Sequence, residues 1–188
     1  MADIDVDALE GVLAKTEQLL EGTGDDDGGR PTPCPDFDVK DLTSHIVGWI
    51  QQFAAGVNGR DSGIDPTTYR AGDDAVEVYR SAADDALAGW RAGAADGTVH
   101  VYQGEIPGQM AFAMMLGEYL VHGWDLAVAT DQPVPFTDDE AALALEHLQP
   151  VLQPEYRGES FGAEVEVPDD APALDRLVAF TGRRPQTV

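Results

Sequence analysis

The sequence predicts an all-α protein, a four-helix bundle with a small helical C-terminal extension. Apolar residues recur at helical spacing in four long segments. Helix caps and glycine- or proline-rich loops separate these segments, and two shorter helical segments follow them. Long helices joined by short loops are typical of a bundle. The six expected helices span residues 5–21, 38–57, 73–92, 107–129, 137–149 and 171–181.

The first three helices are defined by their ends and by their apolar faces. The first helix ends at Gly22, where a loop rich in Gly, Asp and Pro begins. Asp38 suits the N-cap of the second helix, and Asp41 three residues later gives a start that resembles a capping box. This helix ends at Asn58-Gly59. The third helix has one continuous apolar stripe, which predicts packing against the bundle.

The fourth helix is expected to be the central one. Residues 97–106 alternate weakly and predict a short extended stretch before it. Pro107 suits the first helical turn, and the helix is apolar on nearly every side between Ala111 and Val121. A helix of that kind is usually buried. Thr137–Glu140 match a capping box that opens the fifth helix, and residues 151–168 are expected to be irregular.

The length of 188 residues suits one domain with a substantial core. Within residues 1–188 we expect residues 1–132 to form the four-helix bundle. We expect residues 133–188 to be the helical extension that packs on it.

Charge and composition narrow the function classes. The chain carries 35 acidic and 11 basic residues, a formal net charge of −24. Such a surface repels phosphate backbones and anionic membranes, so we expect no nucleic-acid or membrane partner. No apolar stretch is long enough to span a bilayer. The acidic N-terminus and the single cysteine predict a cytoplasmic protein. The acidity favours a halophilic source, with a GC-rich genome as the alternative.

Three inward polar residues carry the candidate chemistry. His45 lies inside the apolar stripe of the second helix. Glu118 lies in the most apolar run of the chain, and a buried carboxylate must be protonated, paired or bound to a metal. His122 follows one helical turn later and shares its face. A single core histidine usually only packs, and Glu118 with His122 alone could form a simple hydrogen bond.

Taken together, these residues predict a divalent metal site. Two imidazoles and one carboxylate leave coordination positions open for water or substrate, which is the catalytic pattern. Zinc is our first expectation among the metals, while nickel, iron and manganese accept the same ligands. Asp125 follows His122 by three residues. Two interpretations are equally favoured: it orients a ligand imidazole, or it is a surface residue at the helix end.

Other candidates have plainer interpretations. Trp49 and Trp124 are expected to be core or pocket wall around the site. Cys34 lies between two prolines with no basic residue nearby in the sequence, which favours a structural role. Arg183 and Arg184, close to the C-terminus, are expected to be a solvated charge pair, with contact to an anionic substrate as the alternative.

Two segments carry a resemblance to a known family. Residues 32–45 (TPCPDFDVKDLTSH) and 117–127 (GEYLVHGWDLA) resemble the metal-binding domain of mycothiol-dependent maleylpyruvate isomerase, in the DinB/YfiT-like superfamily of metalloenzymes. Residues 161–168 and 174–185 look like the short C-terminal part of its stand-alone relatives. The resemblance implies a four-helix bundle whose metal is held by His45, Glu118 and His122.

The resemblance also implies a thiol-dependent isomerase or S-transferase that acts on a small electrophile. A low-molecular-weight thiol would be the cosubstrate, activated as a thiolate by the metal. The open alternatives are a metal-dependent hydrolase and a non-catalytic metal-binding bundle. We expect a small-molecule substrate, and a homodimer stays open beside a monomer.

Overall fold

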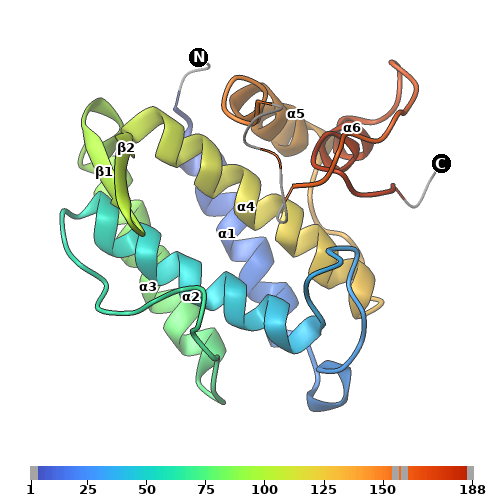
Figure 1. The fold of residues 1–188 in the computed structure, drawn as a ribbon, viewed down its shortest axis with the longest axis horizontal. Helices are drawn as coiled ribbons and strands as arrows, with labels where there is room; N and C mark the ends of the chain where they lie inside the picture. Colours follow the sequence, from blue (N-terminus) through green and yellow to red (C-terminus); the bar gives the residue numbers. More distant parts are fainter. Residues whose placement is uncertain (1–3, 154–156, 158–160, 186–188) are drawn as a thin grey trace.

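Four long helices lie side by side as a bundle in the computed structural model, which describes residues 4–153, 157 and 161–185 (Figure 1). The helices form a closed ring in which α1 contacts α3 and α4, and α2 contacts the same two helices. The four helices are α1 (Val6–Glu21), α2 (Val39–Val57), α3 (Ala75–Arg91) and α4 (Gly108–Ala129).

Shorter elements lie at the ends and on one side of the bundle. A two-stranded antiparallel hairpin lies between α3 and α4 in the chain. The α5 helix packs on α4, and α6 packs on α5 (Figure 1). These elements are η1 (Asp25–Asp27), η2 (Ala94–Asp96), β1 (Thr98–Val101), β2 (Gly104–Pro107), α5 (Asp138–Leu148) and α6 (Ala173–Phe180).

Local chemistry explains where several helices begin. The carboxylate of Asp5 accepts a hydrogen bond from the Ala8 amide at 2.9 Å, and Asp38 accepts one from Asp41 at 2.8 Å. Each bond satisfies one of the amides that a helix start leaves without a partner. Thr137 opens α5 with a complete capping box.

The α4 helix lies at the centre of the described fold. It contacts α1, α2 and α5, and most of its residues are buried. Small residues allow these close approaches, since a Cβ at Gly117 would lie 2.4 Å from Leu148 of α5. The apolar surface of α4 therefore packs against neighbouring helices on most of its sides.

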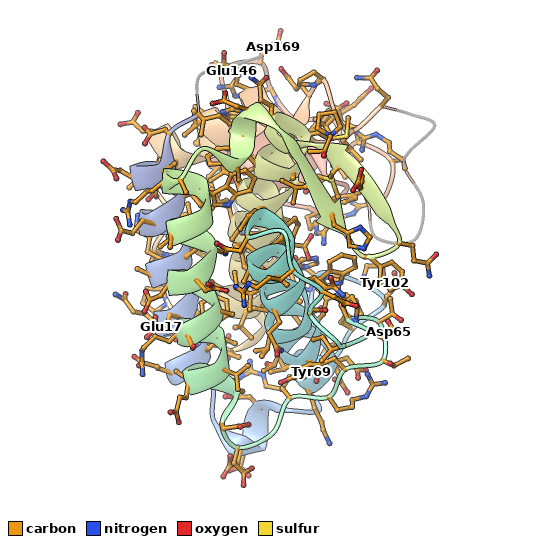
Figure 2. The ribbon with its side chains drawn as sticks, turned by 90° about the vertical axis from the view of Figure 1, so that its left-hand side faces the viewer. Glu17, Asp65, Tyr69, Tyr102, Glu146 and Asp169 are labelled. Atoms are coloured by element: carbon orange, nitrogen blue, oxygen red, sulfur yellow. The ribbon has the colours of Figure 1, made fainter. Side chains whose placement is uncertain are left out.

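The hairpin reaches across the outer side of α2. Tyr102, at its turn, has a positive φ of 54°. Figure 2 shows Tyr102, Asp65 and Tyr69 on one side of the molecule, where the loop between α2 and α3 runs beneath the hairpin. The Tyr102 ring also contacts the Trp49 ring edge-on, with centroids 5.9 Å apart. The hairpin, this loop and α2 thus enclose one flank of the bundle.

The predicted helical fold is confirmed, with two refinements. The extended stretch is a paired hairpin, and because Pro107 ends its second strand, α4 begins one residue later than expected. The described part of residues 151–168 contains no helix or strand, as expected. Among the described residues, no helix has the length and apolarity needed to cross a membrane.

The close approach of α2 to the hairpin can be tested at Gly56. A Cβ at this position would lie 2.0 Å from the His100 carbonyl oxygen, which belongs to the backbone and cannot move alone. We expect Gly56→Ala to lower the free energy of unfolding by about 1–3 kcal/mol in urea titrations. The control is Gly29→Ala, where nothing lies within 4 Å. It should change stability by less than about 0.5 kcal/mol. Equal stability of the two variants would contradict this packing.

Candidate metal centre

Two adjacent helices bring His45, Glu118 and His122 together. His45 projects from α2, and Glu118 and His122 project from the neighbouring face of α4, one turn apart. The His122 side chain is 2 % exposed, whereas those of His45 and Glu118 are 16 % and 15 % exposed. The group therefore lies at the edge of the core, with one side open toward solvent.

The Glu118 carboxylate lies between the two imidazoles. Its Oε1 atom is 2.5 Å from His45 Nε2 and 3.6 Å from His122 Nε2. The two imidazole rings meet edge-on with centroids 4.8 Å apart. Zinc ligands lie about 2.0–2.2 Å from the ion, so the ligand atoms of one ion lie within about 4.4 Å of each other. The 3.6 Å separation suits two ligands of one ion, whereas the 2.5 Å contact between Glu118 and His45 is a direct hydrogen bond that a bound ion would have to open.

The surroundings favour the ionised form of Glu118. Burial raises its pKa, but the opposing influence of His122, His45 and Arg183 is larger. The net result lowers the pKa from the ordinary value of 4.5 to about 2. A carboxylate that stays charged at neutral pH is a ready acceptor for a cation or for an N–H donor.

A second potential metal group shares His122. Cys34, His122 and Asp125 each offer one ligand atom, and these atoms lie within 4.8 Å of one another. Asp125 Oδ2 is 3.0 Å from His122 Nδ1, and Asp125 is fully buried. The two nitrogens of one ring therefore face two different groups: Nε2 faces Glu118 and Nδ1 faces Asp125.

Arg183 is the residue whose place the sequence did not predict. We expected a solvated charge, but Arg183 is only 4 % exposed, and its guanidinium donates to Asp125 Oδ2 at 3.0 Å. It also donates to the Thr181 carbonyl at 2.9 Å. The turn after α6 thus inserts a cation beside Asp125, 58 residues away in the sequence. The only hint in the sequence is Asp125 itself, a charge on a buried helix that needs a partner.

Cys34 lies next to these charges but stays a thiol. Burial raises its pKa, and this effect exceeds the lowering influence of nearby Arg183. A raised pKa disfavours the thiolate, which is the reactive form of cysteine. No basic residue is near Cys34 in the sequence, whereas the fold brings Arg183 close. The interpretation of Cys34 as structural still fits the direction of its pKa.

Aromatic side chains surround the two imidazoles. Phe37 lies with its ring centroid 4.8 Å from His45 and 6.1 Å from His122. Trp49, one turn after His45, has its ring centroid 6.1 Å from that imidazole. Trp124 is 4 % exposed and belongs to the apolar core. It is not among the described residues that line the cavities beside His45.

Two cavities of different chemistry meet at His45 and Trp49. One, of about 360 Å³, lies toward the loop between α2 and α3. It is called the polar cavity because Asp41, Ser44 and Arg70 line it, together with aromatic side chains such as Phe37 and Tyr69. The other, of about 430 Å³, lies between α2, α4 and the chain after α5 and is lined mainly by apolar side chains. Glu118 borders only the apolar cavity.

Comparisons with known proteins agree with this architecture. The family described as "Mycothiol maleylpyruvate isomerase N-terminal domain" matches residues 9–127. Two uncharacterized proteins, from two strains of Mycobacterium tuberculosis, are each 34% identical to the chain over 171 residues. Each alignment covers 88% of this chain and 90% of the relative. No solved structure matches the chain.

The buried pair of Arg183 and Asp125 can be tested by unfolding. Arg183→Met leaves the fully buried Asp125 carboxylate without its guanidinium, so we expect a loss of about 3–5 kcal/mol in the free energy of unfolding. The neighbouring Arg184 is exposed, and Arg184→Met should change stability by less than about 0.5 kcal/mol.

A double variant separates charge from shape at this pair. Arg183→Met combined with Asp125→Leu leaves neither charge unpaired, so it should unfold at higher urea concentration than Arg183→Met alone. If Arg183→Met and Arg184→Met unfold at the same urea concentration, the buried ion pair does not contribute as described.

Proposed function

The chain belongs to the mycothiol maleylpyruvate isomerase N-terminal domain family, and on that premise we propose that it is a metal-dependent enzyme. The proposed reaction is the thiol-dependent transfer or isomerisation of a small electrophile. The observation that carries the proposal is the Glu118 carboxylate, which lies between the imidazoles of His45 and His122. These three side chains would hold one divalent metal, with zinc as the first expectation.

The charges near the site support a bound cation. Glu118 and Asp125 contribute two negative charges, and Arg183 contributes one positive charge. The two imidazoles lower the Glu118 pKa through positive charge, and they must lose that charge to bind a metal. A divalent ion would take over the balance of the Glu118 charge and leave one net positive charge, which would raise the affinity of the site for an anionic nucleophile.

The group containing Cys34 is the less suitable one. Its carboxylate, Asp125, already accepts a charged hydrogen bond from Arg183. A metal there would lie beside a guanidinium and repel it, and the raised pKa of Cys34 opposes the thiolate that a metal needs. We therefore propose that the metal is bound by the group containing Glu118. The group containing Cys34 would support that site without binding a metal.

Asp125 supports the site by fixing the His122 imidazole. An ionised carboxylate only accepts hydrogen bonds, so the proton of the neutral imidazole lies on Nδ1, which faces Asp125 at 3.0 Å. The lone pair then lies on Nε2, the nitrogen that faces Glu118. Carboxylates behind metal-binding histidines commonly set the tautomer in this way. Arg183 in turn holds Asp125 in place.

A divalent metal lowers the pKa of a thiol or water that it binds, and so supplies a nucleophile at neutral pH. The chain's residues determine which nucleophile and substrate reach it. The partly exposed side of the group, where His45 and Glu118 border the cavities, leaves room for both. A hydrolase that activates water and a non-catalytic metal-binding bundle are the alternatives to thiol transfer.

The ligand assignment can be tested by zinc titration of the metal-free protein with a competing fluorescent chelator. We expect His45→Ala and Glu118→Ala each to weaken zinc binding at least about tenfold, since each removes one ligand. The matched controls are His100→Ala and Glu105→Ala, both on exposed positions of the hairpin. They account for weak binding of zinc to the acidic surface. Equal affinity in all four variants would make the ligand set wrong.

The reaction class can be tested with 1-chloro-2,4-dinitrobenzene. The zinc-loaded protein should release chloride and form the thioether when mycothiol is added, and Glu118→Ala should abolish the protein-dependent rate. Cysteine and 2-mercaptoethanol test whether another thiol serves. Formation of dinitrophenol without any thiol would favour the hydrolase, and no protein-dependent reaction in either case would favour the non-catalytic bundle.

A further inference from the structure

Two facing stripes of side chains extend from the candidate metal centre. On α4, Met110, Met114 and Glu118 follow one another at intervals of four residues, and on α2 the same spacing joins His45 to Trp49 and Phe53. Residues four apart share one helix face. Each stripe therefore has a polar residue of the centre at one end and apolar residues at the other.

The two stripes line one cavity of about 430 Å³. Because His45 lies next to Glu118 while Trp49, Phe53, Met110 and Met114 line the same space, the two helices run in opposite directions along it. Figure 1 shows α2 and α4 side by side in this arrangement. Helical rise places residues eight apart about 12 Å from each other, which sets the length of the apolar walls. The rest of the lining comes from Leu148, Val151, Leu152 and Phe161.

We infer that this cavity binds the uncharged, apolar body of the substrate, with a single polar or electrophilic head directed at Glu118 and His45. The inference rests on the proposed function, because the head must reach the metal centre. An extended chain of about eight carbons matches the walls in length. Methionine is flexible and polarisable, so Met110 and Met114 can adapt to bodies of different shape.

The same walls reject a substrate with a second charge. Among the described residues that line this cavity, no lysine or arginine is present, and Glu118 is the only carboxylate. Arg183 is already bound to Asp125, and Arg70 lines the polar cavity. A carboxylate at the far end would lose its hydration without gaining a partner, which is unfavourable. We therefore expect dicarboxylates to bind less tightly than neutral apolar molecules with one reactive head.

Three hydroxamates with the same metal-binding head can test separately the binding of the head, the binding of an apolar body and the rejection of a second charge. Acetohydroxamate carries only the head, octanohydroxamate adds an apolar chain, and suberate monohydroxamate adds a chain of similar length that ends in a carboxylate. Their affinities for the zinc-loaded protein can be measured by calorimetry. We expect octanohydroxamate to bind about a hundredfold more tightly than acetohydroxamate, because each buried methylene adds to the affinity. Suberate monohydroxamate should lose most of that gain.

A charge placed in the wall should reverse the preference. Met114→Lys puts a cation opposite the chain, so it should weaken octanohydroxamate binding about tenfold and strengthen suberate monohydroxamate binding. Met114→Gln is the uncharged comparison, and thermal unfolding verifies that both variants fold. The control Arg70→Ala, in the polar cavity, should leave all three affinities unchanged.

Each result has one meaning. If acetohydroxamate does not bind to zinc-loaded protein, the open metal centre of the proposed function is wrong. If it binds but octanohydroxamate binds no more tightly, the metal centre stands and the apolar substrate class is overturned. Equal binding of the two long hydroxamates, or a loss of binding in Arg70→Ala but not in Met114→Lys, overturns it as well.

Discussion

The carboxylate of Glu118 is the constraint around which this bundle is arranged. A charged group at the edge of the most apolar helix is unfavourable unless nearby groups compensate for it. His45 can reach the carboxylate only if α2 lies directly beside α4 at this level. The distance of 2.5 Å between His45 Nε2 and Glu118 Oε1 shows that it does. The packing of α2 against α4 therefore brings His45 to Glu118. Phe37 in turn lies against the imidazoles of His45 and His122.

The polar groups near Glu118 form a chain that crosses the interior. The Glu118 carboxylate is followed by the His122 imidazole, then by the Asp125 carboxylate and finally by the Arg183 guanidinium. The contacts from His122 to Asp125 and from Asp125 to Arg183 are 3.0 Å each, whereas Glu118 and His122 lie 3.6 Å apart, beyond hydrogen-bond distance. A chain of this kind has a direction. Its open end, at Glu118, faces the apolar cavity, and its closed end is the buried guanidinium of Arg183.

The helices and two of the site residues could be predicted from patterns between neighbouring residues, whereas the long-range contacts could not. Caps at Asp38 and Thr137 and the apolar periodicity are properties of neighbouring residues, so helix positions follow from the sequence. Glu118 and His122 share a helix face by their spacing alone. Arg183 differs because no periodicity relates a residue after the last helix to Asp125, and only the folded path of the chain brings them together. The two cavities likewise depend on how helices, hairpin and loop meet.

The contact between Arg183 and Asp125 links two parts of the chain that evolution can alter separately. The segment matched by the family ends at residue 127, so it contains Asp125 but not its cation. A homologue with a different C-terminal segment must provide a positive charge at the same place or replace the aspartate. Positions 125 and 183 should therefore change together across related sequences, and that covariation would mark which C-terminal segments are compatible with this bundle.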